Sequence, residues 1–195
     1  MNSGGRSPGW GLWARWFLAT FIGYFVGFAV GKNVGIVLGN TIVSLFDPGT
    51  LLFIGLCVGA GIGFAQVHAV RRVLPLNLRW ILGATVGAGL PITVAVLVNE
   101  GWFGAVEASV VWLIPIVIVA GAFAGVIQTA ALRRHTHRAG WWIWTSVVSW
   151  GIMSLLFFSF DNAGLGLLIG VLVFGALSGA FLIWLVRTSP VTDAV

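Results

Sequence analysis

The sequence predicts an all-α integral membrane protein in which six transmembrane helices form three parallel-repeat helical hairpins with pseudo-three-fold symmetry. Composition, charge placement and an internal repeat predict it. Of 195 residues, 59% are hydrophobic and 8% are charged, and the mean hydropathy is +1.05. Soluble domains carry roughly 25% charged residues, so this chain has too few to cover a water-soluble globule. A cytosolic enzyme, a disordered chain and a collagen are thereby excluded.

The charges alternate between the two sides of the predicted membrane. The arginines and Asp193 fall at one set of boundaries between apolar segments, with a net charge of +8; Lys32 and the other four acidic residues fall at the opposite set, with −3. Cytoplasmic loops carry the excess of Lys and Arg, so both termini are expected in the cytoplasm. The calculated pI of about 11.2 then reflects topology, and no nucleic-acid partner is expected.

The first apolar segment, from Leu12 to Phe46, is longer than one crossing requires, at ~50 Å of helix. We expect Lys32 and Asn33 to mark the outer interface. Residues 34–46 would then be an exterior extension, an interfacial helix, a re-entrant segment or part of the first helix. Asp47-Pro48-Gly49 predicts the following turn. The early arginines also suggest a signal peptide, but the long apolar segment favours a retained helix.

Five further segments have the length of a membrane span, about 20 residues of helix. Several ends of the predicted spans, the first span included, carry Trp next to Arg or Trp, at Arg15-Trp16, Arg79-Trp80 and Trp141-Trp142, as expected of interfacial anchors. The expected spans are about 50–70, 80–98, 108–132, 141–160 and 164–186.

An internal repeat relates three pairs of these helices. Residues 59–72 (GAGIGFAQVHAVRR) and 121–134 (GAFAGVIQTAALRR) share seven of fourteen positions without gaps, and 175–188 (GALSGAFLIWLVRT) matches more weakly. The chain is therefore a single transmembrane domain, 1–195, with hairpins at about 12–73, 79–134 and 141–187 and with cytoplasmic tails 1–11 and 188–195. Repeats that each cross twice share one orientation and are related by an axis along the membrane normal.

Glycines recur at intervals of four, which places small residues on one stripe of a helix. We expect this stripe to pack helices within the bundle; the alternative is that the longest run, from Gly23 to Gly39, docks a helix of another protein. The helix-packing candidates are Gly23, Gly27, Gly31, Gly55, Gly59, Gly63, Gly121, Gly125, Gly175 and Gly179.

Four residues are polar intramembrane candidates: Gln66, Gln128, His68 and Asn99. The two glutamines occupy equivalent repeat positions, where the third copy has Leu182. They predict either interhelical hydrogen bonds or a polar vestibule that contacts a ligand. His68 is interpreted as a helix-end side chain reaching the interface, with haem or pigment ligation as the alternative.

The basic loops predict contact with anionic lipid head groups rather than a metal site, because arginines flank His135 and His137. No cofactor and no metal are expected. No ionisable side chain lies clearly within a span and no catalytic motif is present, so the chain is not expected to be an enzyme or an ion-coupled transporter. The lipid head-group candidates are Arg71, Arg72, Arg133, Arg134 and Arg138.

The repeated signature G-x-x-x-G-x-x-Q-x-x-x-(L/V)-R-R, carried by Gly59 to Arg72 and by Gly121 to Arg134, resembles one found in uncharacterised bacterial multi-pass membrane proteins. The resemblance implies a bacterial inner membrane and no particular activity. We expect a non-enzymatic membrane protein whose partners are membrane lipids and other membrane subunits, for which it serves as an accessory or scaffold. The alternatives are a small solute or lipid channel or carrier along the repeat axis, and a pigment- or haem-binding subunit.

Overall fold

The computed structural model describes residues 9–38, 48–99, 110–160 and 162–188, and these residues form six α-helices without strands. Each helix falls on one predicted apolar segment, because a segment that lies in hydrocarbon must pair its own backbone groups. The helices are α1 (Trp10–Leu38), α2 (Pro48–Val70), α3 (Leu78–Asn99), α4 (Val110–Leu132), α5 (Trp141–Ser159) and α6 (Ala163–Thr188).

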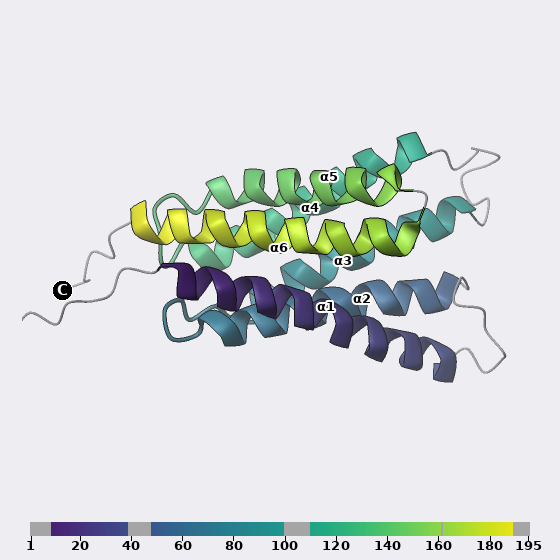
Figure 1. The fold of residues 1–195 in the computed structure, drawn as a ribbon, viewed down its shortest axis with the longest axis horizontal. Helices are drawn as coiled ribbons and strands as arrows, with labels where there is room; N and C mark the ends of the chain where they lie inside the picture. The colour runs from purple at the N-terminus through teal and green to yellow at the C-terminus, as the bar shows by residue number, and fades with distance from the viewer. Residues whose placement is uncertain (1–8, 39–47, 100–109, 161, 189–195) are drawn as a thin grey trace, which may run out of the picture.

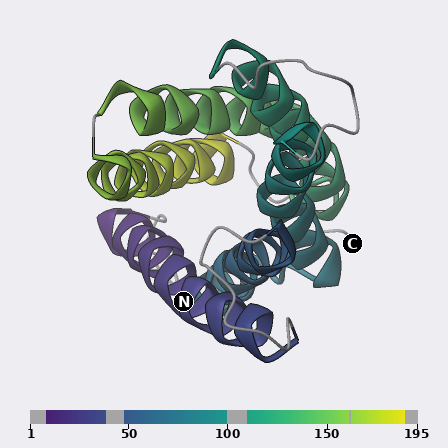
Figure 2. The same cartoon turned by 90° about the vertical axis from the view of Figure 1, so that its right-hand side faces the viewer.

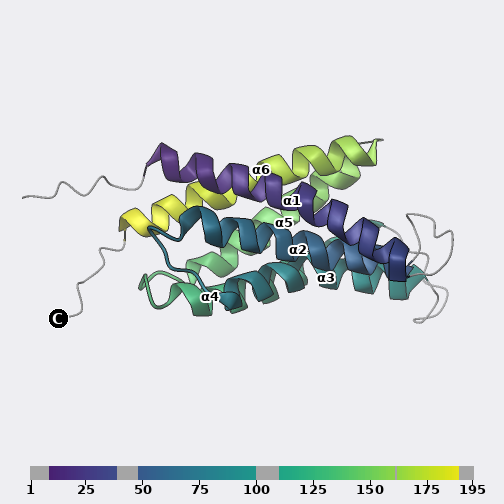
Figure 3. The same ribbon diagram turned by 90° about the horizontal axis from the view of Figure 1, so that it is seen from below.

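The six helices form a closed ring. Over the described residues, backbone contacts join each helix to the next along the chain and join α6 back to α1, with none across the ring (Figure 2). The start of α1, the end of α6 and the α2–α3 and α4–α5 turns lie at one end of the bundle (Figures 1 and 3). We call it the arginine end, because it carries Arg15, Arg71, Arg72, Arg79, Arg133, Arg134, Arg138 and Arg187.

Among the described residues, four helical segments are long and apolar enough to cross a membrane by length and composition: 10–37, 50–70, 114–132 and 164–188. Helix α5 contains a shorter apolar stretch, Trp141–Phe157. Large apolar side chains such as Phe64, Phe123 and Leu155 are more than half exposed on the outer faces. Such surfaces are rare on soluble monomers and are consistent with contact to lipid.

The structure decides one open boundary of the first hairpin and corrects one predicted turn. Helix α1 continues through Lys32 and Asn33 to Leu38, and the Asn33 amide donates to the Ala29 carbonyl (2.7 Å) without breaking the helix. Residues 34–38 are therefore part of α1, while 39–46 lie outside the described residues. Pro48 and Gly49, expected in a turn, are the first residues of α2, where proline has no N–H to lose; Asp47 is not described.

The glycine stripe of α1 is covered by α2 of the same chain. A Cβ atom built at Gly23 would lie 2.5 Å from the Gly61 carbonyl oxygen, and one at Gly31 would lie 2.6 Å from the Ile54 Cα. Gly27 and Gly35 meet α2 in the same way. The described part of this stripe is thus occupied within the bundle and is not open to a helix of another protein.

Glycines of the even-numbered helices pack against the next hairpin. Gly59 and Gly63 face α3, Gly121 and Gly125 face α5, and Gly175 and Gly179 face α1 across the seam that closes the ring. Gly55 is buried on α2. The small residues therefore let neighbouring helices approach both within a hairpin and between hairpins.

Replacing Gly27 with Ala should destabilise the protein, because the added methyl would meet backbone atoms of Cys57 and Val58. Overpacking of this kind costs about 1–3 kcal/mol. Thermal unfolding in detergent should show a lower Tm for Gly27→Ala. The matched control is Gly11→Ala, also on α1, whose Cβ would meet nothing within 4 Å. Equal Tm values for the two variants would contradict the packing seen here.

Candidate functional site

Three tryptophans from equivalent positions of the repeat meet inside the ring. Trp16 of α1, Trp80 of α3 and Trp142 of α5 lie with their ring centroids 5.6, 6.1 and 5.0 Å apart for the pairs 16–80, 16–142 and 80–142. They are at most 3% exposed. Because the backbones of α1, α3 and α5 do not touch one another, these indoles fill the space between them. We call the three residues the tryptophan cluster.

The prediction that these tryptophans are interfacial anchors is wrong. Their side chains point into the bundle, where three large rings bury more apolar area than small residues could. The neighbouring Trp141, by contrast, is 55% exposed, and Trp10 at the start of α1 is 81% exposed. Proximity to arginine in the sequence therefore did not distinguish the inward-facing tryptophans from the outward-facing ones.

Each indole N–H of the tryptophan cluster donates to an oxygen of the preceding hairpin. Trp80 Nε1 donates to Gln66 Oε1 (2.9 Å), and Trp142 Nε1 donates to Gln128 Oε1 (2.8 Å). Trp16 Nε1 donates to Ser178 Oγ (3.0 Å) on α6. The bonds thus join hairpin one to two, two to three and three to one, and they close a cycle around the ring.

The amide nitrogens of the two glutamines are paired as well. Gln66 Nε2 donates to Thr20 Oγ1 (2.9 Å), which itself donates to the Trp16 carbonyl (2.9 Å). The second hairpin has Ala84 where the first has Thr20, and there Gln128 Nε2 approaches the Trp80 carbonyl directly, at 3.5 Å. Both amides are therefore linked to a backbone carbonyl of the first helix of their own hairpin. Gln66 reaches it through the Thr20 hydroxyl, and Gln128 reaches it directly.

The third hairpin provides the acceptor for its indole bond with different residues. Leu182, at the glutamine position, is fully buried in the apolar cluster around the tryptophans. Ser178, one turn earlier on α6, accepts the Trp16 bond and donates to the Phe174 carbonyl (2.7 Å). Ser178 was not predicted as a site residue; the available signal was a hydroxyl in the third repeat where the second has Ala124.

The burial of the two glutamines distinguishes between the two predicted roles, an open vestibule and interhelical hydrogen bonds. Gln66 and Gln128 are 3% and 7% exposed, so neither amide faces an open vestibule. Apolar residues of α1, α2, α4, α6 and the α2–α3 and α4–α5 turns surround the tryptophan cluster at the arginine end. A second apolar cluster containing Tyr24, Val58 and Trp150 occupies the other half. The geometry is that of interhelical hydrogen bonds inside an apolar core.

The other candidates do not join this site. His68 is exposed near the end of α2, away from the buried Gln66. Asn99 is the last residue of α3, and its side chain lies outside the described residues. Within the described part of the chain, no group of three or more His, Cys, Asp or Glu side chains could hold a metal ion. The lipid head-group candidates are all exposed at the arginine end: Arg71, Arg72, Arg133, Arg134 and Arg138.

Searches against protein families, curated proteins and solved structures find no match to this chain.

Breaking one hydrogen bond of the cycle should destabilise the fold. Introducing the serine–leucine pair of the third hairpin at the same positions of the second should restore the stability. Gln128→Leu leaves the buried Trp142 N–H without its acceptor, which costs about 1–3 kcal/mol. Adding Ala124→Ser to Gln128→Leu reproduces the Ser178 and Leu182 arrangement, and we expect it to recover most of the lost Tm in detergent.

Ala124→Ser alone is the control for this experiment, since it adds the hydroxyl while the glutamine still pairs with Trp142. If the Tm changes of Gln128→Leu and Ala124→Ser simply add in the double variant, the serine does not replace the amide as the hydrogen-bond acceptor of Trp142.

Proposed function

We propose that the protein is a non-enzymatic integral membrane protein that serves as an accessory or scaffold subunit of a larger membrane assembly. The observation that carries the proposal is the cycle of indole bonds to Gln66, Gln128 and Ser178. In this cycle the polar groups at the centre of the bundle are paired with one another. Such a core fixes the shape of the bundle and uses its buried amides and indole N–H groups for packing.

The proposal includes six crossings by three like-oriented hairpins around a pseudo-three-fold axis. Support comes from the equivalent positions of Trp16, Trp80 and Trp142 in the repeat and from their mutual contact. It also comes from the glycines that pack each hairpin against the next. Three crossings by α1, α3 and α5 and three by α2, α4 and α6 would place every arginine on one side.

We place the arginine end in the cytoplasm, below a bacterial inner membrane. The rule that cytoplasmic loops are rich in Lys and Arg supports this orientation, and the resemblance of the repeat signature supports the bacterial membrane. The described outer faces carry large exposed apolar side chains on all six helices, which suits contact with lipid and with the helices of partner subunits.

The arrangement favours a scaffold over a channel along the axis. A pathway would have to pass the tryptophan cluster, whose three indoles are almost fully buried. Opening it would break interhelical hydrogen bonds worth about 0.6 kcal/mol each and expose paired amides. Haem or pigment ligation by His68 gains no support, because this side chain is exposed near the end of a helix.

Topology can be tested with single cysteines in a Cys57→Ser background, since Cys57 is the only cysteine. A cysteine at Arg134 and one at Asn162, both exposed and at opposite ends of the bundle, should be labelled from opposite sides of the membrane. An impermeant maleimide on intact cells should label only Asn162→Cys. Labelling of both residues from the same side would contradict the orientation.

The scaffold role predicts stable partners. A tagged chain purified in mild detergent should co-purify with one or more membrane proteins in fixed stoichiometry, measured by native mass spectrometry. An unrelated tagged multi-pass protein from the same host serves as the control. A monomer without partners, combined with solute flux in proteoliposomes that rises in Trp80→Ala, would instead favour the channel.

A further inference from the structure

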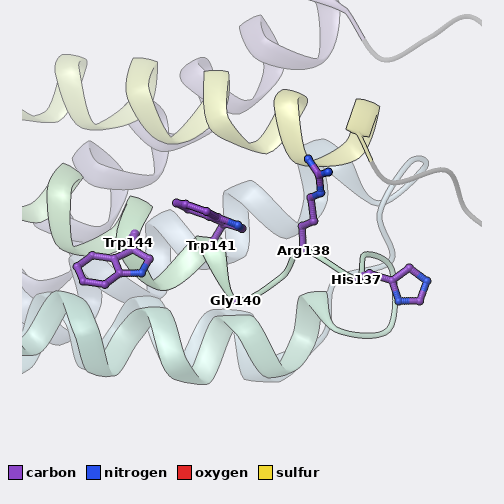
Figure 4. Close-up of a pocket in the computed structure, with 5 residues that line it drawn as sticks. All are labelled: His137, Arg138, Gly140, Trp141 and Trp144. Carbon is purple, nitrogen blue, oxygen red and sulfur yellow. The ribbon is translucent and has the colours of Figure 1, made fainter.

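A surface cavity at the arginine end combines a cation with exposed aromatic rings. Its volume is about 290 Å³, and its lining residues come from the α4–α5 turn and the start of α5 (Figure 4). These residues are His137, Arg138, Gly140, Trp141 and Trp144. The cavity lies outside the ring of helices, so it is independent of the tryptophan cluster.

Arg138 is the cation of this cavity. Its guanidinium carbon lies 5.8 Å from the centre of the Trp184 ring on α6, a distance at which the ring face attracts the charge. Figure 4 shows the Arg138 side chain extending towards α6, whereas the His137 ring points away from the tryptophans. A guanidinium held in this way presents a planar set of N–H donors that matches a phosphate.

An apolar stripe leads from the cavity along α5. Trp141 and Trp144 are 55% and 64% exposed, and Val148 and Leu155 on the same face are 51% and 53% exposed. At 1.5 Å per residue the stripe extends about 20 Å from the interface, which is enough to accompany an acyl chain through one leaflet. The Arg138 guanidinium of the cavity is therefore continuous with an exposed apolar stripe on α5.

The charge of the surroundings selects an anionic ligand. Residues 108–160 contain no Asp or Glu, while Arg133, Arg134 and Arg138 lie within six positions of one another. A zwitterionic head group would bring its own ammonium into this basic turn, whereas an anionic one would not. Basic segments at the cytoplasmic surface attract anionic lipids for the same reason.

We propose that this cavity binds one anionic phospholipid of the cytoplasmic leaflet. The phosphate lies on the Arg138 guanidinium, the indoles of Trp141 and Trp144 lie at the level of the glycerol and ester groups, and an acyl chain follows Val148 and Leu155. Tryptophan favours this interfacial depth because its ring is apolar and its N–H is polar. The inference rests on the membrane placement proposed above, but not on the scaffold role.

The test is native mass spectrometry of the full-length protein in detergent, titrated with phosphatidylglycerol or with phosphatidylethanolamine of the same acyl chains. Arg138→Gln should reduce retained phosphatidylglycerol about fivefold, the effect expected of one interfacial cation. Arg79→Gln is the matched control: it removes an exposed arginine in the first turn of α3 and should change retention less than twofold. Trp144→Ala should weaken phosphatidylglycerol binding and leave the Tm unchanged.

Three results would overturn the proposal. Equal retention of the two lipids would show that charge does not select the ligand, and equal loss in Arg138→Gln and Arg79→Gln would show a diffuse basic surface. Competition by glycerol phosphate as strong as by the intact lipid would show a phosphate site without an acyl track. Partner co-purification and cysteine labelling are measured separately, so a failure here is distinguishable from a failure of the proposed function.

Discussion

A polar group in the hydrocarbon core of a bilayer has no water to bond, so it must find its partner within the protein. Here, the indole N–H groups of Trp16, Trp80 and Trp142 and the amides of Gln66 and Gln128 meet this constraint by pairing with one another and with the backbone. Each indole bond joins two hairpins, so satisfying the constraint also closes the ring. Losing one partner leaves a buried donor or acceptor unpaired, which makes the cycle costly to interrupt.

The size of the side chains also determines how the six helices pack. Glycines stand where neighbouring helices meet, as at Gly27 against α2 and Gly63 against α3, and they permit close backbone approach. Tryptophans stand where the helices diverge around the centre, and their volume fills the space that a ring of six would otherwise leave. Small residues between neighbouring helices and large ones at the centre together give a bundle with a filled interior.

A filled interior places the features that can recognise other molecules on the outside. The arginine end offers cations, the outer faces offer apolar side chains, and the two meet in the cavity of Arg138, Trp141 and Trp144. In a membrane, this distribution would direct interactions to the perimeter of the bundle, where exposed apolar side chains and arginines lie. The proposed scaffold role and the proposed phospholipid site both depend on that distribution.

The sequence by itself determined the number and course of the helices, because the thickness of the bilayer and the need to pair backbone groups act on each segment separately. The end of α4 at Leu132 and the equivalence of Gln66 and Gln128 were both readable from it. Only the tertiary structure decided that Trp16 faces inward while Trp141 faces outward, that Ser178 replaces a glutamine, and that α1 continues past Lys32. Which side of a helix meets a neighbour depends on how all six pack together, and no local pattern of residues contains that information.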